Sequence, residues 1–389
     1  MRGEGEEENE VLFASYISID FMSLVLYRKY RPQKFSEFIG QEHIVKTLTN
    51  AISGEMISHA YLFAGPRGSG KTTLARLLAK AVNCQNRKKG ESEPCNKCSS
   101  CLEIMEGRSM DLMEIDAASH RGIDDARELI DGIRFMPTKS KYKVFIIDES
   151  HQLTREAANA LLKTLEEPPA HAIFILATTE IHKMIPTIVS RCQRFDFRKL
   201  TLSEIMKKLE RITEKEKVRI EKPALELIAI NSEGSFRDAE SLLDQVFTLF
   251  GEKEIKVEDI KDLLGLVEIE LVSRFCEFLC QKNPFGAINF LNELVEKGTD
   301  LEEFTKVLIN YLRQGLILKI MGVDGNPFTS GLTKEEVQKL KTQSENFREE
   351  DLKKILNLFL DAKNKMKYSP IPQLPLELAI IEAIGPTNN

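Results

Sequence analysis

Long apolar segments are absent from this 389-residue chain. Charged side chains interrupt every apolar run well short of the ~18 residues that a membrane-spanning helix requires. The N-terminal residues are acidic, whereas a secretory leader begins with a basic region followed by an apolar core. These absences argue against a membrane protein and against export, so the sequence predicts a cytoplasmic protein.

A surplus of positive charge is also missing. The chain has 54 Lys and Arg residues against 60 Asp and Glu residues, which gives a net charge of −6. Contact with nucleic acid would therefore depend on a local group of Lys and Arg side chains. The hydrophobic content of 42% and the charged content of 29% are typical of a globular protein. A chain of this length predicts two or three domains.

The cysteines are not spread along the chain as a disulfide framework would require. Four of the seven form the pattern C-x10-C-x2-C-x2-C at Cys84, Cys95, Cys98 and Cys101. Four thiolates suit tetrahedral Zn²⁺, and a site with four protein ligands is structural. We therefore expect a zinc module, although the spacing leaves free thiols or a [4Fe–4S] cluster as alternatives. Cys276 and Cys280 are expected in the core of an apolar helix.

The remaining pattern along the chain predicts one α/β region followed by helices. Residues 1–22 are rich in Glu and lack periodicity, so we expect disorder there, and Met22 resembles a natural start preceded by an upstream extension. Further on, β-rich runs alternate with helical runs, which predicts a parallel sheet covered by helices. The expected strands are residues 60–64, 111–115, 143–148, 173–177 and 194–197. The expected domains are 23–198 for the α/β region, 199–250 for a small helical domain and 251–389 for a second helical domain.

A phosphate-binding loop connects the first predicted strand to a helix. It has the pattern G-x-x-x-x-G-K-[ST] and consists of Gly65, Pro66, Arg67, Gly68, Ser69, Gly70, Lys71 and Thr72. Glycines allow backbone N–H groups to turn toward phosphate oxygens, and the following helix N-terminus adds partial positive charge. Lys71 is placed to reach the β- and γ-phosphates, and Thr72 to ligate Mg²⁺. This loop predicts a nucleotide site.

Two carboxylates follow the predicted strand 143–148 at the edge of the sheet where ligands bind. We expect Asp148 to hold the Mg²⁺ shell and Glu149 to orient or deprotonate the attacking water. Thr179 follows the next expected strand, 173–177, and offers a hydroxyl to the γ-phosphate or to that water. Arg191 and Arg237 are weak signals when taken alone, because a single Arg is usually a solvated surface charge.

The order of these motifs closely resembles the bacterial DNA polymerase III gamma/tau subunits, which are clamp-loader ATPases of the AAA+ class. The resemblance begins at residues 26–32 and reaches residues 376–379. Its motifs are the phosphate loop, Asp-Glu-Ser-His at 148–151, Leu-Leu-Lys-Thr-Leu-Glu-Glu-Pro-Pro at 161–169, Ala-Thr-Thr at 177–179, Ser-Arg-Cys at 190–192 and Gly-Ser-Phe-Arg-Asp-Ala at 234–239.

The resemblance implies a role for each of several residues. Thr179 would be the sensor-1 residue, Arg191 the arginine finger that acts on the neighbouring subunit's ATP, and Arg237 the sensor-2 arginine of the lid domain. A guanidinium supplied by a neighbour makes hydrolysis depend on assembly. The implied ATP contacts, besides the phosphate loop and Arg237, are Tyr30, Arg31, Pro32, Ile39 and Thr73. The cofactors would be ATP, Mg²⁺ and Zn²⁺.

The resemblance also implies partners and a cellular role. The chain would join delta, delta prime and further gamma/tau copies, through a helical collar at 251–389, and would load a sliding clamp onto primed DNA for processive synthesis. It would lie in the cytoplasm at the replisome, as an ATPase without polymerase chemistry of its own. His120, Arg121 and Arg127 are candidates for contacts with the DNA phosphate backbone, although a solvated helix face is the alternative.

Two other functions compete with clamp loading. A scaffold that tethers a polymerase or helicase would use its nucleotide pocket for architecture alone, but the catalytic set is complete and no long Pro-rich or charged tail follows. A helicase would need a second sheet domain, which the sequence does not predict. Stimulation of ATP turnover by primed DNA and a clamp would distinguish these functions.

Overall fold

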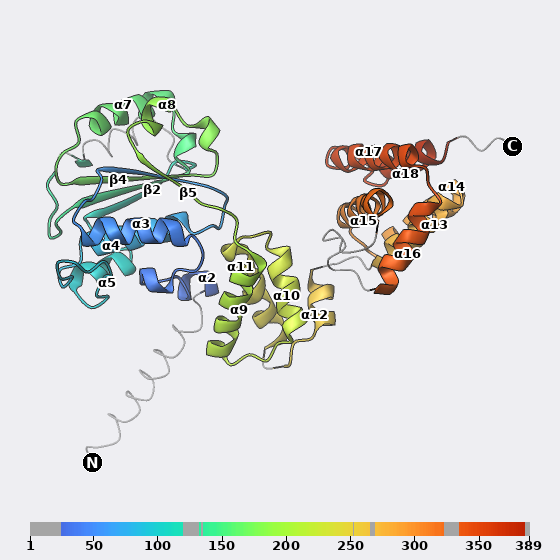
Figure 1. The fold of residues 1–389 in the computed structure, drawn as a ribbon, viewed down its shortest axis with the longest axis horizontal. Helices are drawn as coiled ribbons and strands as arrows, with labels where there is room; N and C mark the ends of the chain where they lie inside the picture. The colour runs from blue at the N-terminus through green and yellow to red at the C-terminus, as the bar shows by residue number, and fades with distance from the viewer. Residues whose placement is uncertain are drawn as a thin grey trace, which may run out of the picture. The chain divides into compact units, whose positions relative to one another are not determined.

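The computed structural model describes residues 25–119, 132–133, 135–251, 253–264, 269–322 and 334–385. The chain divides into two compact units, residues 1–257 and residues 258–389 (Figure 1). The acidic segment 1–22 and the DNA-contact candidates His120, Arg121 and Arg127 lie outside the described residues.

The first unit contains a five-stranded parallel sheet with the strand order β2-β3-β4-β1-β5. The strands are β1 (Ala60–Ala64), β2 (Leu112–Asp116), β3 (Lys143–Asp148), β4 (Ala172–Thr178) and β5 (Gln193–Asp196). Every residue of β1 and β4 is buried, because helices cover both faces of the sheet. The predicted parallel sheet is thereby confirmed.

Each face of the sheet has its own layer of helices (Figure 1). Helices α3 (Glu42–Ser53) and α4 (Lys71–Val82) pack on one face, over Tyr61 and Phe63. Helices α7 (Arg155–Glu166) and α8 (Pro186–Val189) pack on the other face, over Phe145 and Phe174. The shorter elements of this region are α2 (Leu26–Lys29), η1 (Phe35–Glu37), α5 (Ser99–Met105), η2 (Ser150–Gln152) and η3 (Ile181–Lys183).

Three helices follow the sheet within the same unit: α9 (Leu202–Glu216), α10 (Lys222–Asn231) and α11 (Phe236–Phe250). A capping box begins α9, in which Thr201 accepts a hydrogen bond from the Glu204 N–H while the Glu204 carboxylate accepts one from the Thr201 N–H. Arg198 binds the same carboxylate through two guanidinium nitrogens, at 2.9 and 2.6 Å. That pairing outweighs burial and lowers the pKa of Glu204 to about 2, so the junction between sheet and helices is held by charge.

The second unit is helical throughout its described part. Its helices are α13 (Ile269–Cys280), α14 (Pro284–Glu296), α15 (Leu301–Met321), α16 (Lys334–Glu345), α17 (Glu349–Met366) and α18 (Leu374–Ile384), and α12 (Val257–Leu263) begins at its boundary. Their apolar faces meet around Phe275, Phe304 and Phe359. Cys276 lies in this core as predicted, and Cys280 is partly buried. Among the described helices, none combines the length and apolarity needed to cross a membrane.

Candidate nucleotide site and cysteine cluster

The phosphate loop joins the end of β1 to the start of α4. Three of its glycines have positive φ angles, +150° at Gly65, +72° at Gly68 and +97° at Gly70, which side-chain-bearing residues rarely adopt. A Cβ atom on Gly65 would lie 2.4 Å from the carbonyl oxygen of Phe197. The glycines of the motif are therefore required both by the backbone turn and by close packing.

Lys71 points back into the loop that precedes it. Its side chain is buried, and its Nζ donates to the carbonyl oxygens of Gly65 at 2.8 Å and Pro66 at 2.9 Å. Burial lowers the pKa of the Lys71 ammonium, while Glu149 and Asp148 nearby partly offset that effect. The ammonium group is thus held within the phosphate loop, where it can exchange these carbonyl contacts for phosphate oxygens.

The two predicted magnesium ligands are in direct contact. The Thr72 hydroxyl on α4 donates to Asp148 Oδ2 at the end of β3, at 2.7 Å. A hydroxyl and a carboxylate brought together beside a phosphate loop are hard oxygen ligands of the kind that Mg²⁺ prefers. Arg67 at the outer edge of the loop is exposed, whereas Ser69 is buried and donates to the Pro66 carbonyl.

Glu149 and Thr179 form a second pair at this edge of the sheet. Glu149 has a φ of +46°, and its Oε2 accepts hydrogen bonds from the Thr179 hydroxyl at 2.7 Å and the Thr179 N–H at 3.2 Å. The predicted contact of the Thr179 hydroxyl with the γ-phosphate or the attacking water stays a prediction, and in this structure the hydroxyl donates to Glu149. His151 was part of the Asp-Glu-Ser-His motif but was given no role from the sequence, and its Nδ1 lies 3.4 Å from the same Glu149 oxygen. Glu149 and His151 follow β3, and Thr179 follows β4, which is its parallel neighbour in the sheet. Pairing of these two strands was the signal that could have predicted that the three side chains lie together.

The start of α11 docks directly on the phosphate loop. The Phe236 N–H donates to the Gly68 carbonyl at 3.3 Å. A Cβ atom on Gly68 would lie only 1.8 Å from Ser235 Oγ, the side chain that caps α11. The helical segment therefore rests on the loop without any space for a side chain at position 68.

We expect Gly68→Ala to weaken nucleotide binding about tenfold, because the new methyl group would push Ser235 and the start of α11 off the loop. Titration of the chain with a fluorescent ATP analogue and Mg²⁺ measures this effect. The matched control is Gly107→Ala, since Gly107 has the same φ of +72° but no atom near its would-be Cβ. Equal affinities for the two variants would contradict the proposed clash.

Arg237 on α11 stacks on a tyrosine of α2. Its guanidinium carbon lies 5.3 Å from the centre of the Tyr27 ring. Three residues along the chain, the Tyr30 hydroxyl donates to Glu216 of α9, and Lys29 forms an ion pair with the same carboxylate at 2.7 Å. Four of the implied ATP contacts thus belong to a segment that is attached to the helices α9 and α11: Tyr30, Arg31, Pro32 and Ile39.

Arg191 lies at the surface formed by α7 and α8. Its side chain is 33% exposed, and its Nη2 forms an ion pair with Glu166 Oε1 at 2.6 Å. Its Nη1 donates to the Thr187 carbonyl at 2.8 Å. The structure thus places Arg191 on the outer helical layer, while Lys71, Thr72, Asp148, Glu149 and Thr179 meet at the edge of the sheet.

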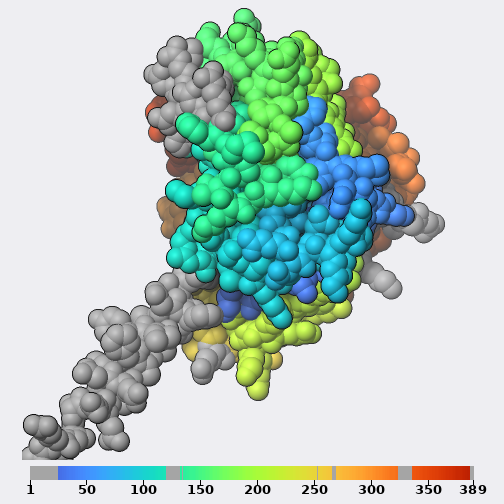
Figure 2. Space-filling view, turned by 90° about the vertical axis from the view of Figure 1, so that its left-hand side faces the viewer, coloured from blue at the N-terminus to red at the C-terminus, as the bar shows by residue number. Residues whose placement is uncertain are grey.

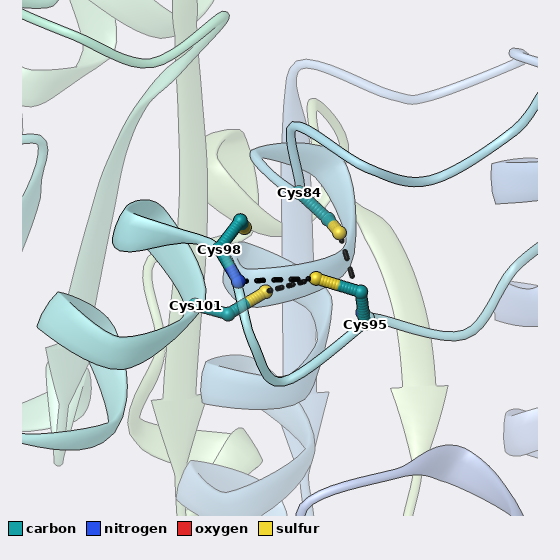
Figure 3. A group of neighbouring side chains, drawn as sticks. All are labelled: Cys84, Cys95, Cys98 and Cys101. Carbon is teal, nitrogen blue, oxygen red and sulfur yellow. Dashed lines mark hydrogen bonds between the residues drawn. The ribbon is translucent and has the colours of Figure 1, made fainter.

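The four cysteines at 84, 95, 98 and 101 are brought together as predicted, with all four sulfur atoms within 4.8 Å of one another (Figure 3). Cys84 follows the end of α4, while Cys98 and Cys101 lie at the start of α5. Tetrahedral zinc with Zn–S bonds of ~2.3 Å requires sulfur separations of roughly 3.8 Å. The sulfur atoms of Cys95 and Cys101 lie 4.0 Å apart. The donor set and its spacing fit a tetrahedral metal ion.

Backbone donors support a thiolate at Cys95 in this cluster. The N–H groups of Lys97 and Cys98 point at Cys95 Sγ, at 3.4 and 3.3 Å, and the Cys95 N–H points at Cys84 Sγ at 3.3 Å. Burial opposes ionisation of Cys95, but these donors and the neighbouring sulfurs prevail and lower its pKa to about 6. Burial raises the pKa of the Cys84 and Cys101 thiols. Cys95 is therefore the ligand whose ionised form the cluster favours, and a bound metal ion would displace the protons of those two thiols.

Comparison with known proteins identifies the family. Residues 40–201 match the family described as DNA polymerase III, delta subunit, residues 204–251 match the DNA polymerase III clamp loader subunit, ATPase lid domain, and residues 255–388 match DNA polymerase III subunits gamma and tau domain III. The chain is 43% identical to the tau subunit of Bacillus subtilis over 92% of its own length and 62% of that protein. It is 35% identical to the gamma subunit of Buchnera aphidicola from Acyrthosiphon pisum, over 93% of its own length and 98% of that protein.

Among solved structures, the chain is similar to the Thermotoga maritima RuvB Holliday junction branch migration motor, at 20% identity and a TM-score of 0.46. That match covers 80% of this chain and 98% of the RuvB chain. The parallel sheet, the phosphate loop and the lid helices define the class of this protein as one with the AAA+ ATPase fold, which implies the use of a nucleotide and Mg²⁺. Within that class, the chain belongs to the DNA polymerase III gamma/tau family. It spans 55–62% of the length of the curated tau subunits that it matches.

Proposed function

We propose that this chain is an ATPase subunit of the bacterial replicative clamp loader, in which ATP binding and hydrolysis drive loading of a sliding clamp onto primed DNA. The observation that carries the proposal is the convergence of Lys71, the Thr72–Asp148 pair and the Glu149–Thr179 pair at one edge of the sheet, with α11 docked on the phosphate loop. This arrangement suits phosphoryl transfer, which depends on positioning and charge neutralisation.

Each of these residues has a proposed role in ATP hydrolysis. Lys71 and the loop amides bind the β- and γ-phosphates, while Thr72 and Asp148 hold Mg²⁺. Glu149 orients the attacking water and accepts its proton, and the contact with Thr179 fixes the position of that carboxylate. Arg237 of the lid helix α11, the segment from Tyr30 to Ile39 and Thr73 of α4 complete the pocket.

The proposal also requires assembly with other subunits. Arg191 on the outer helical layer would complete the ATP site of a neighbouring subunit, which makes hydrolysis depend on that neighbour. Residues 251–389 would form the collar that holds delta, delta prime and further gamma/tau copies together. The exposed apolar side chains of Leu374, Leu378 and Ile381 recur at helical spacing along α18 and support this role.

Contact with DNA would come from the segment that includes His120, Arg121 and Arg127, through the phosphate backbone of the primed duplex. The same role places the protein at the replisome in the cytoplasm. The domain ranges 23–198, 199–250 and 251–389 would then correspond to ATPase, lid and collar.

For the cysteine cluster we propose a structural Zn²⁺ ion held by Cys84, Cys95, Cys98 and Cys101. Four thiolate ligands leave no position open for chemistry, so the ion would stabilise the fold of the loop that carries them. Elemental analysis of the purified chain tests this assignment. One zinc ion per chain is expected. Iron together with the visible absorption of an iron–sulfur cluster would contradict the zinc assignment and favour the [4Fe–4S] alternative.

The function is tested by mixing the chain with its candidate clamp, the other loader subunits and primed DNA. Primed DNA and clamp together are expected to stimulate ATP turnover, because assembly brings the guanidinium of one subunit to the ATP of the next. Turnover without any stimulation would favour a scaffold and overturn the proposal. ATP-dependent strand separation would instead indicate a helicase.

A further inference from the structure

The loop of the cysteine cluster is attached to a segment far away in the sequence. The two carboxylate oxygens of Glu93, which lies two residues before Cys95, accept hydrogen bonds from the backbone N–H groups of Phe35 and Ser36, each at 2.8 Å. Hydrogen bonds to an ionised carboxylate are among the stronger ones in proteins. Glu93 therefore fixes the start of η1, on a segment 57 to 58 residues earlier.

A second contact holds the same segment from the phosphate-loop helix. Lys80 of α4 is only 3% exposed, and its Nζ donates to Gln33 Oε1 at 2.6 Å. The Gln33 N–H in turn donates to Glu37 Oε2 at 2.8 Å. The helix α4 ends at Val82, just before Cys84. The cysteine cluster therefore links the two residues that hold the segment, Lys80 on α4 and Glu93 in the loop.

The supported segment reaches the nucleotide site. The Phe38 ring lies against Gly70 of the phosphate loop, where a Cβ atom would come within 2.6 Å of its tip. Phe35 is buried in the core beneath α3 and α4. At the other end of the segment, Tyr30 is bonded to Glu216 of the lid. Any loosening of residues 33–38 would therefore reach both the phosphate loop and the lid.

The loop that carries three of the four cysteines, residues 83–98, can support residues 33–38 only weakly unless a metal ion links the cysteines. The described elements place no helix or strand between the end of α4 and the start of α5 at Ser99. Arg87 ties this loop to the carbonyls of Ala81 and Glu91, at 2.9 and 2.7 Å. Figure 2 shows the cyan part of the chain that carries this loop at the surface, beside the blue part that precedes β1. A loop without helix or strand gains order chiefly from links between its residues, such as these hydrogen bonds and a metal ion shared by the four cysteines.

We propose that Glu93 is a positioning residue, through which the metal-bound cysteine loop holds residues 33–38 against the phosphate loop. The metal site thereby supports nucleotide binding, although none of its ligands belongs to the nucleotide pocket. This inference rests on the proposed nucleotide site, and it assigns the cysteine module a role in shaping that site.

The test compares Glu93→Gln with wild type in the full chain. The amide nitrogen of Gln would face an N–H donor, so at least one of the two hydrogen bonds is lost while the side-chain shape is kept. Hydrogen exchange at residues 33–38 is expected to speed up about tenfold. The affinity for a fluorescent ATP analogue with Mg²⁺ is expected to fall by about the same factor, with the metal content unchanged. The control is Glu91→Gln, because Glu91 is an exposed residue of the same loop. This variant is expected to behave as wild type.

A second arm removes the metal from wild-type protein with a chelator and then restores it with Zn²⁺. Metal removal is expected to produce the same faster exchange at residues 33–38, reversed by Zn²⁺, and circular dichroism reports whether the helices remain intact. In Glu93→Gln, the chelator is expected to add little further change, because the connection is already broken.

The possible results are distinguishable. Unchanged exchange at residues 33–38 in Glu93→Gln would overturn the proposal, and so would faster exchange with unchanged nucleotide affinity. If wild-type protein bound no nucleotide at all, the proposed function would fail. The exchange data would then still decide whether Glu93 holds the segment.

Discussion

A clamp-loader complex in which every copy of this chain carries Arg191→Ala is expected to bind ATP normally and to hydrolyse it about a thousandfold more slowly. An arginine supplied from a neighbouring subunit stabilises the charge on the transferring phosphoryl group, and its removal typically lowers turnover by ~10³ or more. Binding is expected to persist because Arg191 pairs with Glu166, whereas Thr72 and Asp148 pair with each other beside the phosphate loop.

The ion pair with Glu166 does not prevent this role. Both side chains are partly exposed, at 33% and 50%, and such pairs contribute about 0–1 kcal/mol. Arg191 can therefore leave Glu166 for a neighbour's phosphate at little cost in free energy. Single-turnover hydrolysis and equilibrium nucleotide binding, measured on the same complex, separate the two effects.

Arg194→Ala is the matched control, since Arg194 is an exposed arginine three residues away that pairs with Asp196. It is expected to leave turnover within about twofold of wild type. Full ATP turnover in the Arg191→Ala complex would show that this guanidinium takes no part in hydrolysis. The mechanism of triggering between subunits would then be wrong.

Lys71→Ala is expected to weaken binding of ATP with Mg²⁺ about a hundredfold or more. The buried ammonium is held within the phosphate loop by the carbonyls of Gly65 and Pro66, and its loss removes a charge-assisted donor to the phosphates. Those two carbonyl oxygens also lose their partner, which loosens the loop itself. Fluorescent-nucleotide titration and isothermal calorimetry measure the change.

Lys46→Ala on α3 serves as the control, because Lys46 is exposed and the substitution removes the same charge from the same unit. Circular dichroism is expected to show folded protein for both variants. An affinity of Lys71→Ala close to that of Lys46→Ala would mean that the loop does not bind the phosphates. The proposed ATPase function would then lose its main support.

Much of the fold follows from local sequence patterns. The near-continuous apolar runs at residues 60–64 and 143–148 predicted buried parallel strands, and β1 and β3 have those bounds. Such runs are informative because a strand covered on both faces needs apolar side chains at every position. The resemblance to the gamma/tau subunits is confirmed by matches that extend over most of the chain.

The contacts of the candidate site were less accessible to sequence reasoning. The Thr72–Asp148 pair joins residues 76 positions apart, and the Glu149–Thr179 pair joins residues 30 positions apart. The residue types predicted a magnesium shell and a catalytic carboxylate, but not which side chains touch each other. The roles of Arg191, Arg237 and the implied ATP contacts stay predictions, as do those of His120, Arg121 and Arg127 outside the described residues.

The sequence by itself determined the chemistry of the phosphate loop, the sheet and the four thiol ligands, because each depends on residue type and spacing over a short stretch. Only the tertiary structure decided that Gly68 must accommodate Ser235 and that Glu93 holds Phe35 and Ser36. These contacts join segments that no local periodicity connects. They exist because packing the helices on the sheet brings distant backbone groups within hydrogen-bond range, and a spacing rule does not encode that proximity.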